Sequence, residues 1–518
     1  MSKIANINTT SITDAIQLGC QTMASVFNAD DNNIPFFRSE VYPDPQLSFN
    51  PVHSESHVPG RHLNALLNAE DIGIIIDKAA VEKHAEAAFF SYGGCLPFPL
   101  NRLEINGPRN HFVSHNFREG FHALYALVKY RQSDRAHKIA EDSIKAINQL
   151  WQPKTGWHVN TLQNRYGLHI QDRTFITGIG RAIGPLVKYH RATGYGPALD
   201  LAILLAQKAT SEFFTESGTY NRETFGAHTH STTCVMSSLA QLADHTANIN
   251  LLNRVKNFYD HGLNDIRDAI GWVIESSRDE ANPDMGEINN SGDIVETALI
   301  LGKWGYSEYY EDAERIVRSH VLPAQLRDIS FIKNPPNPNN EDGLKHVAER
   351  HLGAFGFPAP YGHWPIDRKT ISFNMDIVGG GVASLCEVFR NIAETNAAGH
   401  RVNLFFDHET DDIKIESPYT HPALEITVKT SGCLFVRLPS WLSLDAIQIT
   451  GAITPRMDNG YLFFAQPEIG KPITLHFQLP ERHIVLHHRT RNIRARLQGD
   501  CVVAMDNFGA DLTFFDPL

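Results

Sequence analysis

Carboxylates gather in one segment of the chain, GWVIESSRDEANPDMGEINNSGD, residues 271–293. Carboxyl groups on a loop at the mouth of a helical domain suit acid–base chemistry on a sugar. Glu275 follows an apolar run, and burial there would raise its pKa and keep it protonated near neutral pH, as a proton donor requires. We rank Glu275 first as the catalytic acid, Glu287 second and Glu280 third, because Glu280 lies in a polar stretch that suits a solvated surface.

Two histidines, His228 and His230, are separated by one threonine in the stretch GAHTHS. This spacing brings two imidazoles close together, as in many metal sites. The spacing of the remaining residues identifies no third ligand, so we predict hydrogen bonds to a substrate, or a helix cap, in preference to a metal. The sequence-based prediction is therefore no metal and no cofactor.

The stretch YGHWPIDR, residues 361–368, combines aromatic rings with polar groups. Tyr and Trp faces can stack on sugar rings, while His or Asp can hold hydroxyl groups; a packed loop is the alternative. An arginine could neutralise the carboxylate of a uronic acid. The predicted substrate-binding residues are His228, His230, Arg173, Tyr361, His363, Trp364, Asp376 and Gly380.

Three consecutive glycines, Gly379–Gly381, stand between an apolar run and the helical pattern VASLCEVFRNIAE. Glycine costs about 0.5–1 kcal/mol relative to alanine in a regular element, so the triplet needs a reason. It lacks the GxGxxG spacing and the GK[ST] ending of phosphate loops, and it follows no βα unit. We therefore do not expect a phosphate-binding loop here.

Helical patterns come in pairs from about residue 116 to 397, whereas residues 1–100 look irregular. One pair is NFREGFHALYALVKYRQ with DRAHKIAEDSIKAINQLW, and apolar residues recur in it at helical spacing. Asp293 and Ser307 are expected helix N-caps. The long aromatic-rich loops between hairpins suit a closed α/α toroid better than an open solenoid. We predict an (α/α)6 toroid.

The apolar period changes from 3.6 to 2 at about residue 401, where short runs such as LEITVKTS and CLFVRLPSW follow one another. Turn signals separate the runs, including Asp458-Asn459-Gly460. We predict a C-terminal antiparallel β-sandwich. The expected domains are residues 1–398, a toroid with an irregular N-terminal segment, and residues 399–518, the sandwich.

Composition excludes several classes of protein. The 518 residues carry a formal net charge of −12, which argues against binding to nucleic acid or an anionic membrane. The six cysteines are widely spaced, and the first twenty residues contain no continuous apolar segment. We therefore expect free thiols, a cytoplasmic location and a small carbohydrate as the partner. A homodimer is left open.

The order of these elements resembles glycoside hydrolase family 127, which is typified by β-L-arabinofuranosidases. The resemblance covers roughly residues 55–515. It is carried by HTHSTTCVMSSLAQLA, DIVETALILGKWGYSEYYEDAERIVRSHVLPAQL, MDIVGGGVASLCEVFRNI and FVRLPSWL. It implies the toroid-plus-sandwich fold and a carbohydrate substrate.

Members that resemble this chain bind zinc through a glutamate and three cysteines, one of which is the nucleophile. Here the first motif reads Gly286-Glu287-Ile288-Asn289, and the cysteine pair falls within Gly379–Gly381. The glutamate is retained and the thiolates are not. The resemblance therefore implies the fold, but neither the thiolate zinc site nor the cysteine nucleophile.

Three functions remain open. The first is a zinc-independent glycoside hydrolase for a small glycoside or oligosaccharide, in which glycine leaves room for a water and the anomeric configuration is inverted. The second is a lyase acting on a uronic-acid sugar, with His228, His230, Tyr361 and Arg173 available. The third is a sugar-binding protein without catalysis, which the missing cysteines favour.

Overall fold

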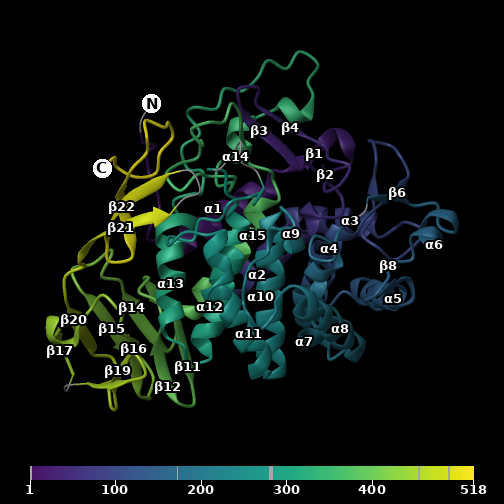
Figure 1. The fold of residues 1–518 in the computed structure, drawn as a ribbon. Coiled ribbons are helices and arrows are strands. Elements are labelled where there is room, and N and C mark those ends of the chain that lie inside the picture. The colour runs from purple at the N-terminus through teal and green to yellow at the C-terminus, as the bar shows by residue number, and fades with distance from the viewer. Residues whose placement is uncertain (1–2, 172, 279–283, 453–454, 488–490) are drawn as a thin grey trace.

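The computed structural model describes residues 3–518 except 172, 279–283, 453–454 and 488–490. Its centre is a ring of six helices, in which each helix contacts the next and the last returns to the first (Figure 1). The six are α2 (Val58–Asp71), α4 (Phe117–Arg131), α7 (Ile183–Thr193), α10 (Thr229–Thr246), α12 (Ile288–Lys303) and α15 (Ile377–Asn391). This closure distinguishes a toroid from an open solenoid.

A second layer of six helices packs around the ring. It consists of α1 (Ile12–Ala24), α3 (Lys78–Ser91), α5 (Asp134–Leu150), α8 (Gly196–Glu212), α11 (Ile249–Asp260) and α13 (Glu308–Ile316). The first outer helix, α1, packs against the last inner helix, α15, so the N-terminal segment completes the ring. The predicted (α/α)6 toroid is confirmed.

The expectation that residues 1–100 are irregular is wrong, because this segment forms α1, α2 and α3. Helix α2 shows why the pattern was hidden. It is buried on nearly all sides, and it buries the polar side chains of Arg61, His62, Asn64 and Asn68 as well as its leucines. Because α2 buries polar side chains on more than one side, Arg61 and Asn64 toward the axis and His62 against His84 of α3, it lacks the single apolar stripe of a surface helix.

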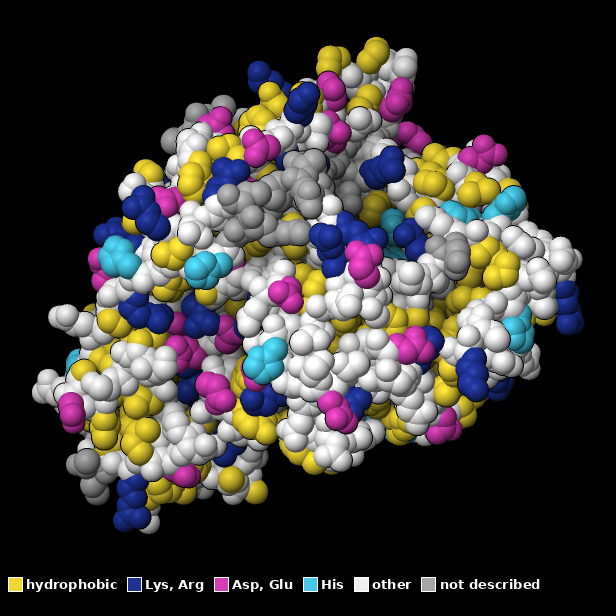
Figure 2. All heavy atoms as spheres, in the orientation of Figure 1, with side chains coloured by type: hydrophobic (Ala, Val, Ile, Leu, Met, Phe, Trp, Pro, Cys, Tyr) yellow, Lys and Arg dark blue, Asp and Glu magenta, His cyan; other side chains and the backbone are white. Residues whose placement is uncertain are grey.

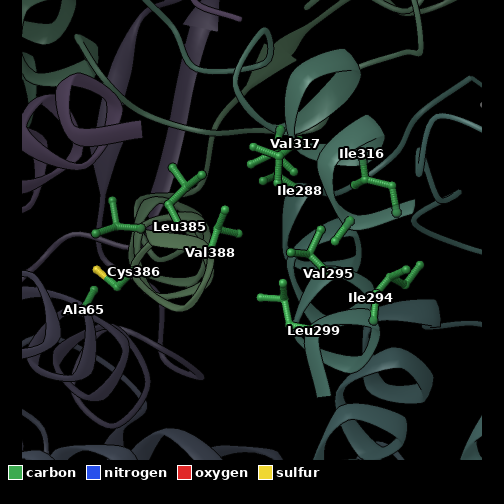
Figure 3. Packing of buried hydrophobic residues seen from close by; sticks show 14 of the residues in the cluster. Ala65, Ile288, Ile294, Val295, Leu299, Ile316, Val317, Leu385, Cys386 and Val388 are labelled. Atoms are coloured by element: carbon green, nitrogen blue, oxygen red, sulfur yellow. The ribbon is translucent and has the colours of Figure 1, made fainter. Parts of the chain in front are cut away.

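Apolar side chains of α12 and α15 meet in the core next to a π-helical turn, Val317–Val321 (Figure 3). Ile294, Val295 and Leu299 come from α12, and Leu385 and Val388 come from α15; each is at most 3% exposed. Each such buried side chain contributes about 1.5–3 kcal/mol to folding. Among the described residues, no helix combines the length and the apolar character needed to cross a membrane.

The C-terminal region contains two five-stranded sheets (Figure 1). One has the order β11 (Ala393–Asn396), β12 (Gly399–Val402), β16 (Leu434–Arg437), β19 (Tyr461–Phe464) and β18 (Arg456–Asp458). The other has the order β13 (His408–Glu409), β14 (Ile413–Glu416), β15 (Leu424–Val428), β20 (Pro472–His476) and β17 (Gln448–Thr450). Their apolar faces share one hydrophobic cluster, as in a sandwich. The described pairings are antiparallel except that β12 and β16 run parallel, which departs from the predicted all-antiparallel arrangement.

Smaller elements surround these two layers. A three-stranded sheet, β21 (Glu481–His487), β22 (Asn492–Gln498) and β23 (Cys501–Met505), lies near the two chain ends (Figure 1). The remaining short strands are β1 (Phe27–Asn28), β2 (Ile34–Pro35), β3 (Arg38–Tyr42), β4 (Gln46–Ser48), β5 (Asn101–Arg102), β6 (Arg109–Val113), β7 (Trp151–Gln152), β8 (Gly156–Trp157), β9 (His169–Gln171) and β10 (Ile371–Ser372). The short helices are α6 (Val159–Asn164), α9 (Arg222–Phe225) and α14 (Val347–His351).

A buried ionic cluster joins the toroid to the sandwich. Glu314 of α13 accepts Arg318 at 3.0 Å and Arg437 of β16 at 2.6 Å. Arg318 also donates to the carbonyl of Phe405, in the segment between β12 and β13. Because all three charged side chains are at most 2% exposed, the loss of Glu314 would leave two buried guanidinium groups without their carboxylate.

Candidate active site

The inner helices direct their N-termini toward one end of the ring. Their N-cap residues are His57, Asn116, Ala182, His228, Glu287 and Asp376, for α2, α4, α7, α10, α12 and α15 in turn. Four of these six line one cavity. Helix N-termini carry partial positive charge, so this end of the ring favours carboxylates and other anionic groups.

The cavity has a volume of about 390 Å3, within the range of small-ligand sites. Its lining is mostly polar: Arg38, Asn50, His53, His57, Arg61, His115, His228, His230, Glu275, Glu287, Asn374 and Asp376, with Phe37, Val52, Phe357 and Ile377. Figure 2 shows histidine side chains at the bottom of a hollow in the upper half of the molecule, with Lys and Arg side chains nearby.

Five imidazoles follow one another around the cavity. The ring centroids of His53 and His57 are 4.7 Å apart, and those of His57 and His115 are 5.5 Å apart in a stacked pair. His228 follows His115 at 5.6 Å, and His230 follows His228 at 5.8 Å. Burial lowers the pKa of His228 to about 3, and the arginines nearby act in the same direction. Burial likewise lowers the pKa values of His53, His115 and His230, so these three imidazoles and His228 are neutral at pH 7 and can both donate and accept hydrogen bonds.

Two of the predicted catalytic glutamates lie in this cavity. The segment before α12 pairs with itself through an antiparallel bridge between Ile274 and Gly286. Since side chains alternate along a strand, this bridge places Glu275 and Glu287 on one face as diagonal neighbours. The backbone of Glu275 is fixed, because its N–H donates to Met285 at 2.8 Å and its carbonyl accepts the N–H of Thr229 at 3.2 Å. Glu275 is half-buried and Glu287 is buried.

Glu287 lies deeper, against the ends of α10 and α12. Its Oε1 accepts the Asn289 amide at 2.6 Å and lies 3.5 Å from Nδ1 of His230. Burial raises the pKa of Glu287 to about 8; Arg61 opposes the shift, and the charges of Asp376 and Glu275 add to it. Asp376 behaves in the opposite way. Burial alone would raise its pKa, but Arg61 and His57 hold it below its ordinary value.

Ion pairs close the floor of the cavity. Glu119 of α4 is contacted by Arg181 at 3.0 Å and by Arg61 and Arg118 at 3.3 Å each. Arg118 also reaches Asp293 at 3.3 Å. Asp293 lies inside α12 and not at its N-cap, so that expectation is wrong; the helix begins five positions earlier, at Ile288. The floor blocks the ring axis, so the site is a pocket with a closed end.

The glycine triplet is part of α15, whose first turn packs against this floor. A Cβ on Gly380 would lie 2.9 Å from Nη1 of Arg61 and would overlap the amide oxygen of Asn289. A Cβ on Gly379 would meet the backbone of Arg61 at 3.0 Å. Side chains of α2 and α12 thus fill the space, and the expectation that glycine leaves room for a water is wrong.

The same geometry tests the zinc site that the resemblance implies. That site needs thiolates at position 289 and within the triplet, where this chain has an amide and no side chain. A guanidinium group, that of Arg61, occupies the adjacent space. The amide of Asn289 and the guanidinium of Arg61 cannot replace the thiolate ligands of such a zinc site. The residues present therefore do not fit the family's zinc site.

The structure does not bring the whole predicted set together. Tyr361 is buried away from the cavity, and its hydroxyl donates to Asp284 at 2.7 Å. His363 packs between Phe373 and Phe514. Trp364 donates from Nε1 to the carbonyl of Arg368 and packs on Tyr42. Arg173 lies beside Gly178, and its charge lowers the pKa of His228. Glu280 lies outside the described residues.

Sequence reasoning missed several cavity residues. His53, His57 and Arg61 recur at intervals of four in PVHSESHVPGR, a spacing that places side chains on one face of a helix. This pattern was a usable signal in the segment that was expected to be irregular. His115, in HFVSHNF, becomes a cavity residue only because the ring closes and brings the start of α4 next to the start of α10.

Comparisons with known proteins support the fold. No protein family profile matches the sequence, and no curated protein matches it either. Among solved structures, the chain is similar to a GH127 β-L-arabinofuranosidase from Geobacillus stearothermophilus T6, with a TM-score of 0.58 and 15% identity over 95% of this chain and 80% of that one. A second GH127 β-arabinofuranosidase matches with a TM-score of 0.56 and 13% identity over 95% and 78% of the two chains.

A third solved structure, described as a glycoside hydrolase, matches with a TM-score of 0.55 and 11% identity over 92% of this chain and 84% of that one. These similarities extend over both the toroid and the sandwich. The chain therefore has the toroid-plus-sandwich fold of GH127 proteins. At such identities the likeness concerns the fold, and the chemistry has to be argued from the cavity.

Proposed function

We propose that the chain is a glycoside hydrolase that acts on the terminal sugar of a small glycoside or oligosaccharide. The observation that carries the proposal is the meeting of Glu275, Glu287 and Asp376 in one polar cavity at the N-terminal end of the inner helices. Neutral imidazoles and amides around these carboxylates offer the hydrogen bonds that sugar hydroxyl groups need. The fold of GH127 arabinofuranosidases adds support from analogy.

Glu275 is the proposed proton donor. It lines the cavity and is half-buried, so a bound sugar can reach it, while Glu287 is only 6% exposed and turned toward His230 and Asn289. Two backbone hydrogen bonds hold the Glu275 segment in place, which gives the donor a fixed position. In the reaction, Glu275 would give its proton to the oxygen of the departing group.

Asp376 is the proposed base that activates the attacking water. Arg61 at 3.3 Å and His57 at 3.1 Å keep its carboxylate ionised. No nucleophilic side chain stands at Gly379–Gly381, so a direct attack by water is the simpler route, and it inverts the anomeric carbon. Because ion pairs close the floor, the cavity suits the end of a sugar chain, as in exo-acting enzymes.

The lyase alternative loses support from the geometry. It needs Tyr361 and Arg173 near His228, but the hydroxyl of Tyr361 is engaged by Asp284 outside the cavity. A sugar-binding protein without catalysis remains the other alternative, and it predicts binding without turnover.

The test is a panel of aryl glycosides and short oligosaccharides, read by released phenol and reducing sugar, with absorbance of unsaturated products in parallel. We expect hydrolysis of at least one furanoside or pyranoside, and a loss of about 100-fold or more in kcat for Glu275→Gln. The matched control is Glu223→Gln, which changes an exposed carboxylate paired with Arg278. Formation of unsaturated products would support the lyase, and sugar binding without any turnover would support the non-catalytic alternative.

A further inference from the structure

We propose that His228, His230 and Glu287 together bind one zinc ion at the inner end of the cavity. Each residue contributes one ligand atom, and these atoms lie within 4.8 Å of one another. Two imidazoles with one carboxylate form a donor set that zinc accepts, with the fourth position left open. This set uses neither position 289 nor the glycine triplet, so it differs from the thiolate site that the family resemblance implies.

The second nitrogen of each imidazole already has an oxygen neighbour. Nδ1 of His230 lies 3.5 Å from Glu287, while its Nε2 lies 3.4 Å from Asp293 on the opposite side of the ring. Nδ1 of His228 is 2.8 Å from the hydroxyl of Ser231, which leaves Nε2 of His228 for the metal. Histidine ligands commonly have such an outer partner, which fixes the tautomer and the ring orientation. Asn289 orients Glu287 in the same way.

The distances are close to those of an assembled site. Ligands at the Zn–N and Zn–O distances of about 2.0–2.2 Å in a tetrahedron are roughly 3.3–3.6 Å apart. His230 and Glu287 already have this separation. The widest separation, at most 4.8 Å, has to close by roughly 1.3 Å. Small side-chain rotations of His228, which is half-buried at the start of α10, can supply that movement.

The charges at the floor leave one carboxylate for a cation. Four buried acidic groups meet three arginines there: Glu119, Asp293, Asp376 and Glu287 against Arg61, Arg118 and Arg181. The ion pairs among the described residues engage these arginines with Glu119, Asp293 and Asp376. The ionic contact of Glu287 in this set is with His230. A bound zinc would replace the proton of Glu287 and balance the charge of this fourth carboxylate.

All three ligands line the cavity, so the open coordination position faces the space in which we place the sugar. A zinc ion there would accept a hydroxyl oxygen of the substrate, or a water. The metal proposal does not rest on the proposed hydrolysis, because metal binding can be measured in the full chain without any substrate.

The experiment uses the full-length protein, stripped with a chelator and dialysed, with Zn²⁺ measured by calorimetry and Co²⁺ by its visible absorption. We expect one equivalent of either ion and Co²⁺ bands of the intensity that low-coordinate sites give. His228→Gln, His230→Gln and Glu287→Gln should each weaken Zn²⁺ binding by about 100-fold or more. The matched control, His115→Gln, removes a cavity imidazole outside the set and should keep wild-type affinity and spectrum.

Far-UV circular dichroism and thermal melting of the metal-free variants establish that each one is folded. If His230→Gln does not fold, His228→Gln still tests the site, because His228 is less buried. Equal Zn²⁺ affinity in the wild type and in the folded variants would place the metal elsewhere and overturn the proposal. So would the absence of stoichiometric binding in the stripped wild-type protein.

Discussion

Alanine at Gly380 tests the claim that side chains of neighbouring helices fill the space where the resemblance would place a thiolate. In an ordinary helix, Gly→Ala stabilises by about 0.5–1 kcal/mol. Here the new Cβ would overlap the amide oxygen of Asn289 and lie 2.9 Å from Nη1 of Arg61, and both atoms are buried. Overpacking of this kind costs about 1–3 kcal/mol.

Displacement of the Asn289 amide would also weaken its 2.6 Å hydrogen bond to Glu287, at about 1–3 kcal/mol. The terms sum to a net destabilisation of about 1–5 kcal/mol for Gly380→Ala. Urea unfolding at equilibrium measures it, and a shift of the midpoint at constant slope shows a change in stability.

Two companion variants make the reasoning specific. Gly196→Ala, at the start of α8, meets nothing within 4 Å and should be neutral or slightly stabilising. Asn289→Gly removes the overlapped amide, so the double variant with Gly380→Ala should recover part of the loss, as a coupling of at least about 1 kcal/mol. A Gly380→Ala protein as stable as the wild type would refute the close packing at this position.

Three further predictions concern stability and cysteine chemistry. Glu314→Gln should destabilise by about 3–5 kcal/mol in urea unfolding, because it leaves two buried guanidinium groups without their carboxylate. Asp268→Asn should raise stability at pH 8 by up to about 4 kcal/mol, since burial raises the pKa of Asp268 to about 7, and it should leave stability at pH 4 nearly unchanged. Under native conditions Cys95 should react with a thiol reagent well before the others, while denaturation without reductant should expose six free thiols.

The sign of the Asp268 prediction follows from linkage. The pKa of Asp268 is raised on folding, so the folded chain binds the proton more tightly, and stability falls as pH rises from about 4 to 7. Asparagine removes this slope but keeps an oxygen for the N–H groups of Ile270 and Trp272, which now donate to the carboxylate. The reasoning would be contradicted if the melting temperature of the wild type rose from pH 4 to pH 7 and Asp268→Asn abolished this rise.

Specific results would also contradict the predictions for Glu314→Gln and for the cysteines. An unchanged urea midpoint for Glu314→Gln would show that the buried cluster does not stabilise the toroid against the sandwich. Fewer than six thiols in the denatured, unreduced protein would show that some cysteines are paired.

The sequence predicts the outer helices better than the inner ones. Helix α5 has one solvent-exposed face, so its apolar residues recur at helical spacing. Its start is marked by Ser133, whose side chain caps the helix. Helix α2 lies inside the ring and buries Arg61 and Asn64 toward the axis and His62 against His84 of α3, so its apolar pattern is broken. Periodicity detects the contrast between core and solvent, and an inner helix has no solvent face.

The sequence also predicts some parts of the site better than others. Glu275, Glu287, His228 and His230 could be proposed because each stands in a motif with recognisable chemistry. The structure places these four and Asp376, which was also among the predicted residues, at one cavity. The aromatic stretch at 361–368 has a sugar-binding composition, yet its rings pack against other parts of the chain. Composition shows what a side chain can bind, whereas the packing of the whole chain decides which surface it meets.

The convergence of helix caps could not be predicted from local sequence. Four of the six inner helices contribute their N-cap residues to the cavity, and these residues meet only when the ring closes. The signal for His57 existed in the spacing of His53, His57 and Arg61, but it indicates one helix face and not the cavity that this face meets.

The dependence of the rate on the leaving group tests the central claim, that Glu275 donates a proton to a sugar held in this cavity. A proton donor matters greatly for a poor leaving group and little for an activated one such as dinitrophenolate. With a substrate identified in the glycoside panel, kcat is measured for both kinds of aglycone in the wild type and in Glu275→Gln. The account predicts a loss of about 100-fold or more for the poor leaving group and a near wild-type rate for the activated one. An equal loss for both leaving groups, or no loss for either, would contradict it.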